Sequence, residues 1–206
     1  KKIKSLENKT LKIPNLYGPQ RFSRNNHLVG KAIIKRDFKK AVYFILENSG
    51  IIEDKIKDYL TKNKNNYIEA LRIIPLKTRK LFVHSYQSFL FNKIADEYFK
   101  NNKKSKNVEI PLIGFNFDIN EIKNKQLRII IQKILSQENL NPRDFVISQI
   151  PELTSEGGFW NLVFDLKFGV MESKSDELNK DKQKIKINFT LPKSCYATVA
   201  LKFLFQ

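Results

Sequence analysis

The sequence predicts an α+β fold, with helices in roughly the first two thirds of the chain and strands in the last third. Apolar residues recur at helical spacing in several segments between residues 28 and 137. After residue 159 they alternate with polar residues, which is the pattern of half-buried strands. Helices followed by strands, without an internal repeat, are typical of an α+β protein.

The predicted helices begin after a loop at residues 14–26, which is rich in Pro, Gly and Asn. A single amphipathic helix is predicted from Leu28 to about Asn48, where Ser49 and Gly50 provide a stop. The remaining predicted helices span residues 52–62, 67–74, 77–100 and 120–137.

The longest of these helices, at residues 77–100, carries a polar stripe beside its apolar face. Ser85, Ser88 and Asn92 are spaced three and four apart, which places them on one line along the helix. We expect these side chains to hydrogen-bond buried backbone groups.

The second half of the chain contains the predicted strands. Residues 108–117 read as a strand and a turn around Pro111 and Gly114. Residues 172–183 form a polar linker or hairpin loop, and a short closing helix starts at about Tyr196. The other predicted strands span residues 145–149, 159–168 and 184–191.

Charge and residue usage limit the possible functions. The chain has 38 Lys and Arg against 21 Asp and Glu, a net charge of +17, which favours a polyanionic partner. The alternative is a lysine-rich chain that only solvates its surface.

Cys195, His27 and His84 are too few for a disulfide or a zinc site, so we expect no metal. The lack of a possible disulfide framework predicts an intracellular, cytoplasmic location. We also expect no membrane span, because no apolar stretch is long enough to cross a bilayer.

Three motifs occur in a specific order along nearly the whole chain. Residues 15–22 read NLYGPQRF and are followed by HLVG at residues 27–30. Residues 81–92 read LFVHSYQSFLFN, and residues 191–198 read LPKSCYAT. Together they resemble the N-[YF]-F-G-x-Q-R-F-G, A-Y-Q-S-[YF]-x-[FW]-N and L-P-x-x-x-[YF]-A-T motifs of TruD-type pseudouridine synthases, and PLIGF at residues 111–115 resembles an element of the archaeal and eukaryotic branch.

This resemblance implies an α+β architecture of two parts. One is a pseudouridine synthase catalytic domain, a mixed or antiparallel sheet with helices, to which residues 1–45 and 184–206 would belong. The other is a TruD-specific α+β insertion domain at about residues 46–183.

The resemblance also implies an activity, the isomerisation of a tRNA uridine, expected at position 13, to pseudouridine without a cofactor or metal. The family's nucleophile is the Asp of an upstream G-x-K-D motif. The fourteen residues before Asn15 contain no such motif, so we carry over no catalytic residue. We expect a segment outside this chain to supply the Asp, with tRNA and that N-terminal part as partners. The alternative is a non-catalytic basic RNA-binding module derived from the family.

Three residues are predicted to bind substrate by the same resemblance. Tyr17 would stack on the uracil ring, and Tyr196 is a substrate-contacting aromatic of the closing motif. Asn15 would hydrogen-bond the uracil, the sugar or else the loop that carries the catalytic Asp. Each residue also has a structural alternative. Tyr17 would be a buried aromatic of the loop, Asn15 would form a turn, and Tyr196 would anchor the last helix by hydrophobic contact. Predicted supporting residues are Gly18, Gln20, Arg21, His27, Gly30, Gln87, Ser88, Asn92, Ala197 and Thr198.

Several positions depart from the family pattern and indicate a divergent member. Tyr17 replaces the usual Phe, Ser23 replaces Gly, Tyr98 replaces Arg, and residues 157–161 lack an expected Arg. Phosphate contacts are expected from dispersed cations. These cations are Lys31, Lys35, Arg36, Lys39, Lys40, Lys77, Arg79 and Lys80.

Overall fold

The structure, a computed structural model, describes residues 10–102, 108–193 and 195–205. Its contacts divide these residues into two compact units. The strand unit comprises residues 10–18, 108, 161–193 and 195–205. The helical unit comprises residues 19–102 and 109–160. The predicted α+β fold class is confirmed, whereas the assignment of segments to a catalytic and an insertion domain stays a prediction.

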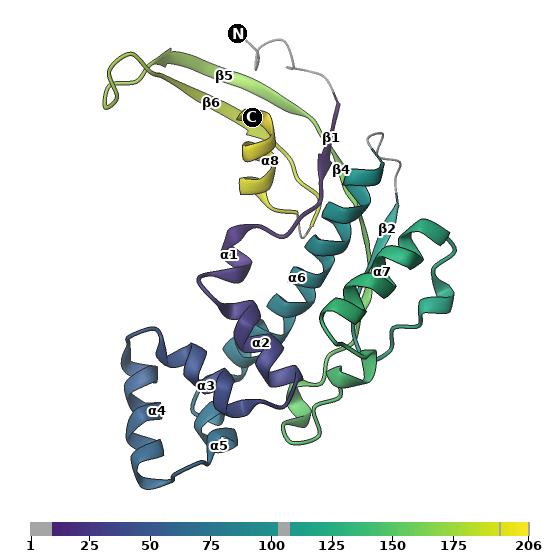
Figure 1. Ribbon diagram of the computed structural model, residues 1–206. Helices are drawn as coiled ribbons and strands as arrows, with labels where there is room; N and C mark the ends of the chain where they lie inside the picture. The colour runs from purple at the N-terminus through teal and green to yellow at the C-terminus, as the bar shows by residue number, and fades with distance from the viewer. Residues whose placement is uncertain (1–9, 103–107, 194, 206) are drawn as a thin grey trace. The chain divides into compact units, whose positions relative to one another are not determined.

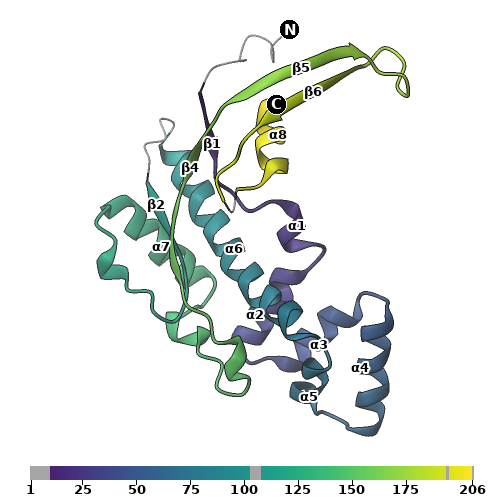
Figure 2. The same cartoon turned by 180° about the vertical axis from the view of Figure 1, so that it is seen from behind.

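The helical unit is built around one long helix, α6 (Leu76–Asn101). Helices α2 and α7 and strand β2 pack on it, and α2 lies beside it in both Figure 1 and Figure 2. The other helices are α1 (Pro19–Phe22), α2 (Asn26–Ile34), α3 (Phe38–Leu46), α4 (Ile51–Lys62), α5 (Tyr67–Arg72) and α7 (Lys125–Gln137). Short 3₁₀ turns η2 (Ile119–Glu121), η3 (Pro142–Phe145) and η4 (Pro151–Leu153) and the paired strands β2 (Glu109–Leu112) and β3 (Gly158–Asn161) complete it.

The predicted single helix from Leu28 to Asn48 is wrong, because the chain forms α2 and α3 with a break between them. Arg36 adopts a left-handed backbone conformation (φ 59°), which ends α2. Asp37 then caps α3 by accepting a hydrogen bond from the backbone N–H of Lys40 at 3.0 Å. The apolar positions keep a similar spacing through the break, so periodicity alone did not reveal it.

Two predicted strands are also corrected. Residues 145–149 form no strand; Phe145 ends η3, whose cap is Asn141 with a Pro at the first helical position. The segment 159–168 is interrupted, since Leu162 separates β3 from β4 (Val163–Leu166). In both cases short apolar runs gave a strand pattern, but local caps and a change of strand partner decided the outcome.

The close approach of α2 to α6 depends on Gly30. A Cβ atom at this position would lie 2.0 Å from the backbone oxygen of Phe82 and 3.2 Å from Cβ of Tyr86. Only glycine allows this contact without moving one helix. This explains the glycine of the HLVG motif by packing rather than by chemistry.

The strand unit holds two antiparallel strand pairs and one helix. Strand β1 (Leu11–Pro14) pairs with β4, with Leu11 opposite Leu166 and Ile13 opposite Phe164. Strand β5 (Phe168–Ser175) pairs with β6 (Gln183–Phe189), and the two form the long hairpin of Figure 1. Only Lys167 separates β4 from β5. This nearly continuous segment therefore pairs first with β1, through β4, and then with β6, through β5.

The core of the strand unit lies on one face of these strands. Helix α8 (Ala197–Phe205) contributes Ala200 and Leu204 to it. The strand residues of this core are Ile13, Phe164, Leu166 and Phe168. Their spacing of two along β4 and β5 follows the alternation of side chains in a strand, and it leaves the intervening positions on the opposite face.

None of the described helices is both long and apolar enough to cross a membrane. Within the same residues, no group of three or more His, Cys, Asp and Glu side chains is placed to hold a metal ion.

Candidate functional site

Asn15 is fixed at the end of β1. Its backbone N–H donates to the carbonyl of Leu162 at 2.8 Å, and its side-chain Nδ2 donates to the carbonyl of Asn161 at 2.9 Å. The amide is therefore held in one orientation by the backbone that enters β4. Its Oδ1 receives no hydrogen bond from the part of the chain that the structure describes, so this atom remains an acceptor.

Tyr17 and Tyr196 lie against each other although 178 residues separate them in the chain. Their ring centroids are 5.9 Å apart and the rings are inclined at 64°, an edge-to-face contact. The carbonyl of Tyr196 accepts the N–H groups of Val199 and Ala200, both at 3.1 Å, so Tyr196 begins α8. The contact joins the first and third sequence motifs within the strand unit.

A second cluster of predicted residues lies in the helical unit, around Arg21. The Nε of Arg21 donates to the hydroxyl of Ser88 at 3.1 Å, and its backbone carbonyl accepts from the hydroxyl of Ser85 at 2.8 Å. Ser88 also donates to the carbonyl of His84 at 2.8 Å. Both serines are fully buried, and they satisfy buried backbone groups as their position in the polar stripe predicted.

His27 is packed between aromatic rings rather than placed for proton transfer. It stacks on Phe89 with centroids 4.9 Å apart and meets the edge of Phe22 at 5.7 Å. Burial lowers the pKa of His27, and the negative charge of Glu138 only partly opposes this. Its buried Nδ1 has no hydrogen-bond partner among the described residues. A neutral, structural imidazole fits these surroundings.

Gln87 connects α6 to two loops. Its buried Nε2 donates to the carbonyls of Ile113 and Glu156, both at 2.9 Å. The glutamine of the second motif therefore supplies hydrogen bonds to two buried backbone carbonyl groups. The remaining predicted residues lie as follows: Gly18 is buried after β1, Gln20 is exposed on α1, Asn92 is half-buried on α6, and Ala197 and Thr198 are exposed at the start of α8.

Sequence reasoning missed Glu138, which lies just after α7. This buried carboxylate accepts hydrogen bonds from Lys31 at 2.6 Å, Lys93 at 2.8 Å and the Tyr86 hydroxyl at 3.0 Å. Burial raises the pKa of Glu138, but these hydrogen bonds and the charge of Lys31 outweigh burial and lower the pKa to about 2. No sequence signal relates Glu138 to Lys31, because 107 positions separate them.

Several cations predicted to contact phosphates make internal interactions instead. Lys35 pairs with Asp144 at 2.7 Å, and Arg36 donates to the carbonyls of Asp144 and Val146. Arg79 is buried and pairs with Glu152 at 2.7 Å, so its guanidinium is not exposed at the surface. The exposed cations of the original set are Lys39, Lys40, Lys77 and Lys80.

Comparison with known proteins supports the same family along the chain. A family model described as tRNA pseudouridine synthase D (TruD) matches residues 1–58, 46–109 and 95–203. Proteins described as "Probable tRNA pseudouridine synthase D" from Methanopyrus kandleri and Nanoarchaeum equitans are 26% and 28% identical to the chain. These two alignments each cover 93% of the chain, and they cover 57% and 60% of the respective relatives.

A solved structure has the same fold. The TruD-type protein of Methanosarcina mazei superposes with a TM-score of 0.75 at 23% identity, over 92% of this chain and 60% of that one. The chain thus spans about three fifths of the length of the relatives that it matches. Because the TruD model matches overlapping segments from residue 1 to residue 203, the chain belongs to the tRNA pseudouridine synthase D (TruD) family.

Proposed function

We propose that the chain is part of a tRNA pseudouridine synthase and forms one wall of the site that holds the target uridine. The observation that carries this proposal is the contact of Tyr17 with Tyr196 in the strand unit, beside a motif whose Asn15 is fixed by two backbone hydrogen bonds. Family membership and the names of the relatives support the reaction and the tRNA substrate.

The chemistry explains why this site uses aromatic rings. The enzyme breaks the bond between N1 of uracil and C1′ of ribose, turns the base and joins C5 to C1′. The C5 proton is released to water, and N1 takes up a proton from water, so the product is an isomer of the substrate. A flat ring can hold the face of a base that has left its stack, and it still permits turning in the plane. Tyr17 takes this role, and Tyr196 restricts the position of its ring.

Asn15 reads the polar edge of the substrate. Because one N–H of Nδ2 is used on the carbonyl of Asn161, the side chain keeps Oδ1 as an acceptor and the second N–H as a donor, and Oδ1 is the atom held in a fixed orientation. This atom suits the N3–H of uracil or a ribose hydroxyl. An Asn15→Asp variant keeps an acceptor but loses the donor that orients it, so it would separate recognition from positioning.

The nucleophile is an aspartate in a segment outside these 206 residues. Two observations support this: the residues before Asn15 contain no G-x-K-D motif, and the matched relatives are longer than this chain. The partner of the chain is then that segment, the N-terminal part of the same enzyme. The substrate is uridine 13 of a tRNA, and the enzyme acts in the cytoplasm.

The test is tritium release from tRNA labelled with [5-³H]uridine. It uses the chain alone and the chain together with a segment that carries G-x-K-D. We expect release only with that segment, and mapping of the product to position 13. Release by the chain alone would refute the external nucleophile. Binding of tRNA without release in either case would favour the non-catalytic RNA-binding module.

Variants then test the aromatic wall. Tyr17→Ala and Tyr196→Ala should each lower the rate of release by about 10- to 100-fold, since base stacking is worth ~1–3 kcal/mol. Tyr43→Ala is the matched control, because Tyr43 is an exposed tyrosine on α3. Equal rates for the three variants would contradict the assignment.

A further inference from the structure

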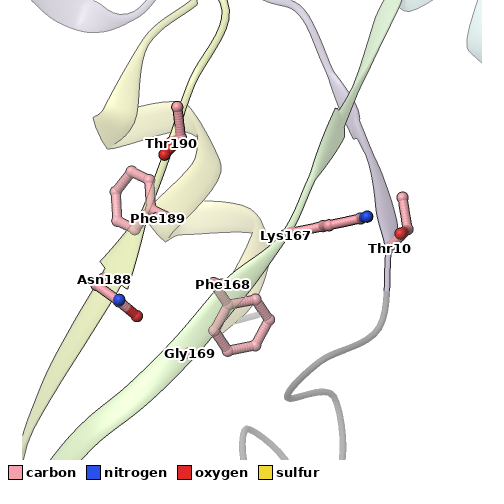
Figure 3. A pocket seen from close by; sticks show the side chains of 7 residues that line it. All are labelled: Thr10, Lys167, Phe168, Gly169, Asn188, Phe189 and Thr190. Carbon is pink, nitrogen blue, oxygen red and sulfur yellow. The ribbon is translucent and has the colours of Figure 1, made fainter.

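A polar hollow lies in the strand unit where the chain from β4 to β5 changes its partner strand. It has a volume of about 480 Å³ and is lined by Thr10, Lys167, Phe168, Gly169, Asn188, Phe189 and Thr190. Figure 3 shows Lys167 extending from the β4–β5 junction toward Thr10, while Asn188 projects from β6 on the other side of Gly169. None of these residues belongs to the three motifs that indicate the family. Thr190 directly precedes the third motif.

Strand alternation explains why polar groups gather here. Gly169 is opposite Asn188 in the β5–β6 register, and Phe168 on the intervening position is buried in the core against α8. Lys167, two residues before Gly169, therefore shares the face opposite to α8. Asn188 and Thr190, also two apart, lie on this same face and are exposed.

Gly169 creates the space for the Asn188 side chain. A Cβ atom at position 169 would lie 2.7 Å from Oδ1 of Asn188. The missing Cβ thus lets the amide rest over the backbone of β5. Gly169 has an ordinary negative φ or extended backbone, so the need for glycine is one of space rather than of conformation.

The polar groups of the hollow are not used within the protein. No residue in the described ranges forms a hydrogen bond or ion pair with the side chains of Thr10, Lys167, Asn188 or Thr190. Asp165, two residues before Lys167, is paired with Lys12 at 3.2 Å, so Lys167 is not needed to neutralise it. The hollow offers one ammonium donor, one amide and two hydroxyls to a ligand.

We propose that this hollow binds the ribose–phosphate backbone of RNA, with Lys167 on a phosphate and the neutral polar groups on ribose and phosphate oxygens. An ammonium recognises phosphate as a point charge, and hydroxyl and amide groups are typical partners of sugar and phosphate oxygens. Polar lining argues against an apolar ligand, and Lys167 argues against a cation. The inference rests on the proposed function, because tRNA is the anionic polymer that a tRNA pseudouridine synthase binds.

The first test measures the affinity of the full chain for an unmodified tRNA transcript between about 50 and 200 mM salt, where phosphate contacts dominate. Lys167→Gln should weaken binding roughly three- to tenfold and reduce the slope of log Kd against log salt by about one phosphate contact. Lys202→Gln is the matched control, since it removes the same charge from an exposed position on α8. It should change neither quantity.

The second variant fills the hollow without changing charge. Gly169→Ala should displace the Asn188 amide, which is the free end of a short side chain, and weaken tRNA binding with the salt slope unchanged. Thermal unfolding should match the wild type. If Lys167→Gln and Gly169→Ala both bind like the Lys202→Gln control, the inference fails and the proposed function stands. If the wild-type chain does not bind tRNA, the inference fails, while the proposed function is still decided by tritium release in the presence of the G-x-K-D segment.

Discussion

Replacing Glu138 with Gln should destabilise the helical unit, and the effect should disappear in acid. Glu138 is held by Lys31 at 2.6 Å, Lys93 at 2.8 Å and the Tyr86 hydroxyl at 3.0 Å. These three residues lie on α2 and α6, so one carboxylate after α7 connects three helices. Glutamine keeps the shape but leaves two ammonium groups around a neutral amide.

The size of the effect follows from the pKa. Lowering the pKa of Glu138 from 4.5 to about 2 corresponds to roughly 3 kcal/mol of preference for the charged form in the folded state. The carboxylate side chain is only 9% exposed, but those of Lys31 and Lys93 are 41% and 34% exposed, so solvent screens part of the attraction. We therefore expect a loss of about 2 kcal/mol at neutral pH.

The pH dependence has a defined sign. A carboxylate whose pKa is lowered by folding stabilises the folded state above its unfolded pKa, and this contribution is lost as pH falls. The difference in unfolding free energy between wild type and Glu138→Gln should be full above pH 4.5 and should shrink as the pH falls toward 2. Urea unfolding followed by circular dichroism measures this difference at each pH.

Glu97→Gln is the matched control for this experiment. Glu97 on α6 also pairs with two lysines, Lys100 and Lys133, but its pairs are at the surface. Its replacement should leave the unfolding midpoint unchanged, since exposed ion pairs contribute little. The reasoning about Glu138 would be refuted if both variants behaved alike, or if the difference for Glu138→Gln did not depend on pH.

Three further predictions concern the helical unit. Gly30→Ala should lower stability by about 1–3 kcal/mol in urea unfolding, because its Cβ would meet the Phe82 carbonyl at 2.0 Å; an unchanged midpoint would show that α2 can move. Asp37→Ala should lower the free energy of unfolding by about 1 kcal/mol, because it removes the cap of α3, and the helical circular dichroism signal should fall. The control Asp37→Asn should retain most of the stability, because Asn also caps helices. His27 should titrate below its ordinary pKa of 6.5 in an NMR pH series because of burial, and a midpoint above 6.5 would contradict its packing between Phe22 and Phe89.

Local patterns in the sequence were sufficient for the regular elements. The apolar spacing of residues 52–62 and 77–100 predicted α4 and α6 to within one residue at each end. The alternation at residues 184–191 predicted β6, which spans Gln183–Phe189. These predictions succeed because a helix or a half-buried strand repeats its buried positions at a fixed local period. The break at Arg36 was missed because one left-handed residue leaves little trace in that period.

The three motifs indicated the family from the sequence alone, but they did not show what each residue contacts. Ser88 and Arg21 are 67 positions apart, and the space that a Cβ at Gly30 would need is occupied by the backbone of Phe82 on another helix. Such contacts depend on how helices approach one another, which is a property of packing and not of local sequence.

The sequence by itself thus determined the fold class, most helices, the basic character and the family of this protein. The tertiary structure decided the contact of Tyr17 with Tyr196, the buried charge of Glu138 and the hollow over Gly169. Each joins residues that are distant in the chain, or that face each other only in one strand register. The physical reason is that burial and strand pairing act between segments, so their consequences for charge and space appear only when the segments are together.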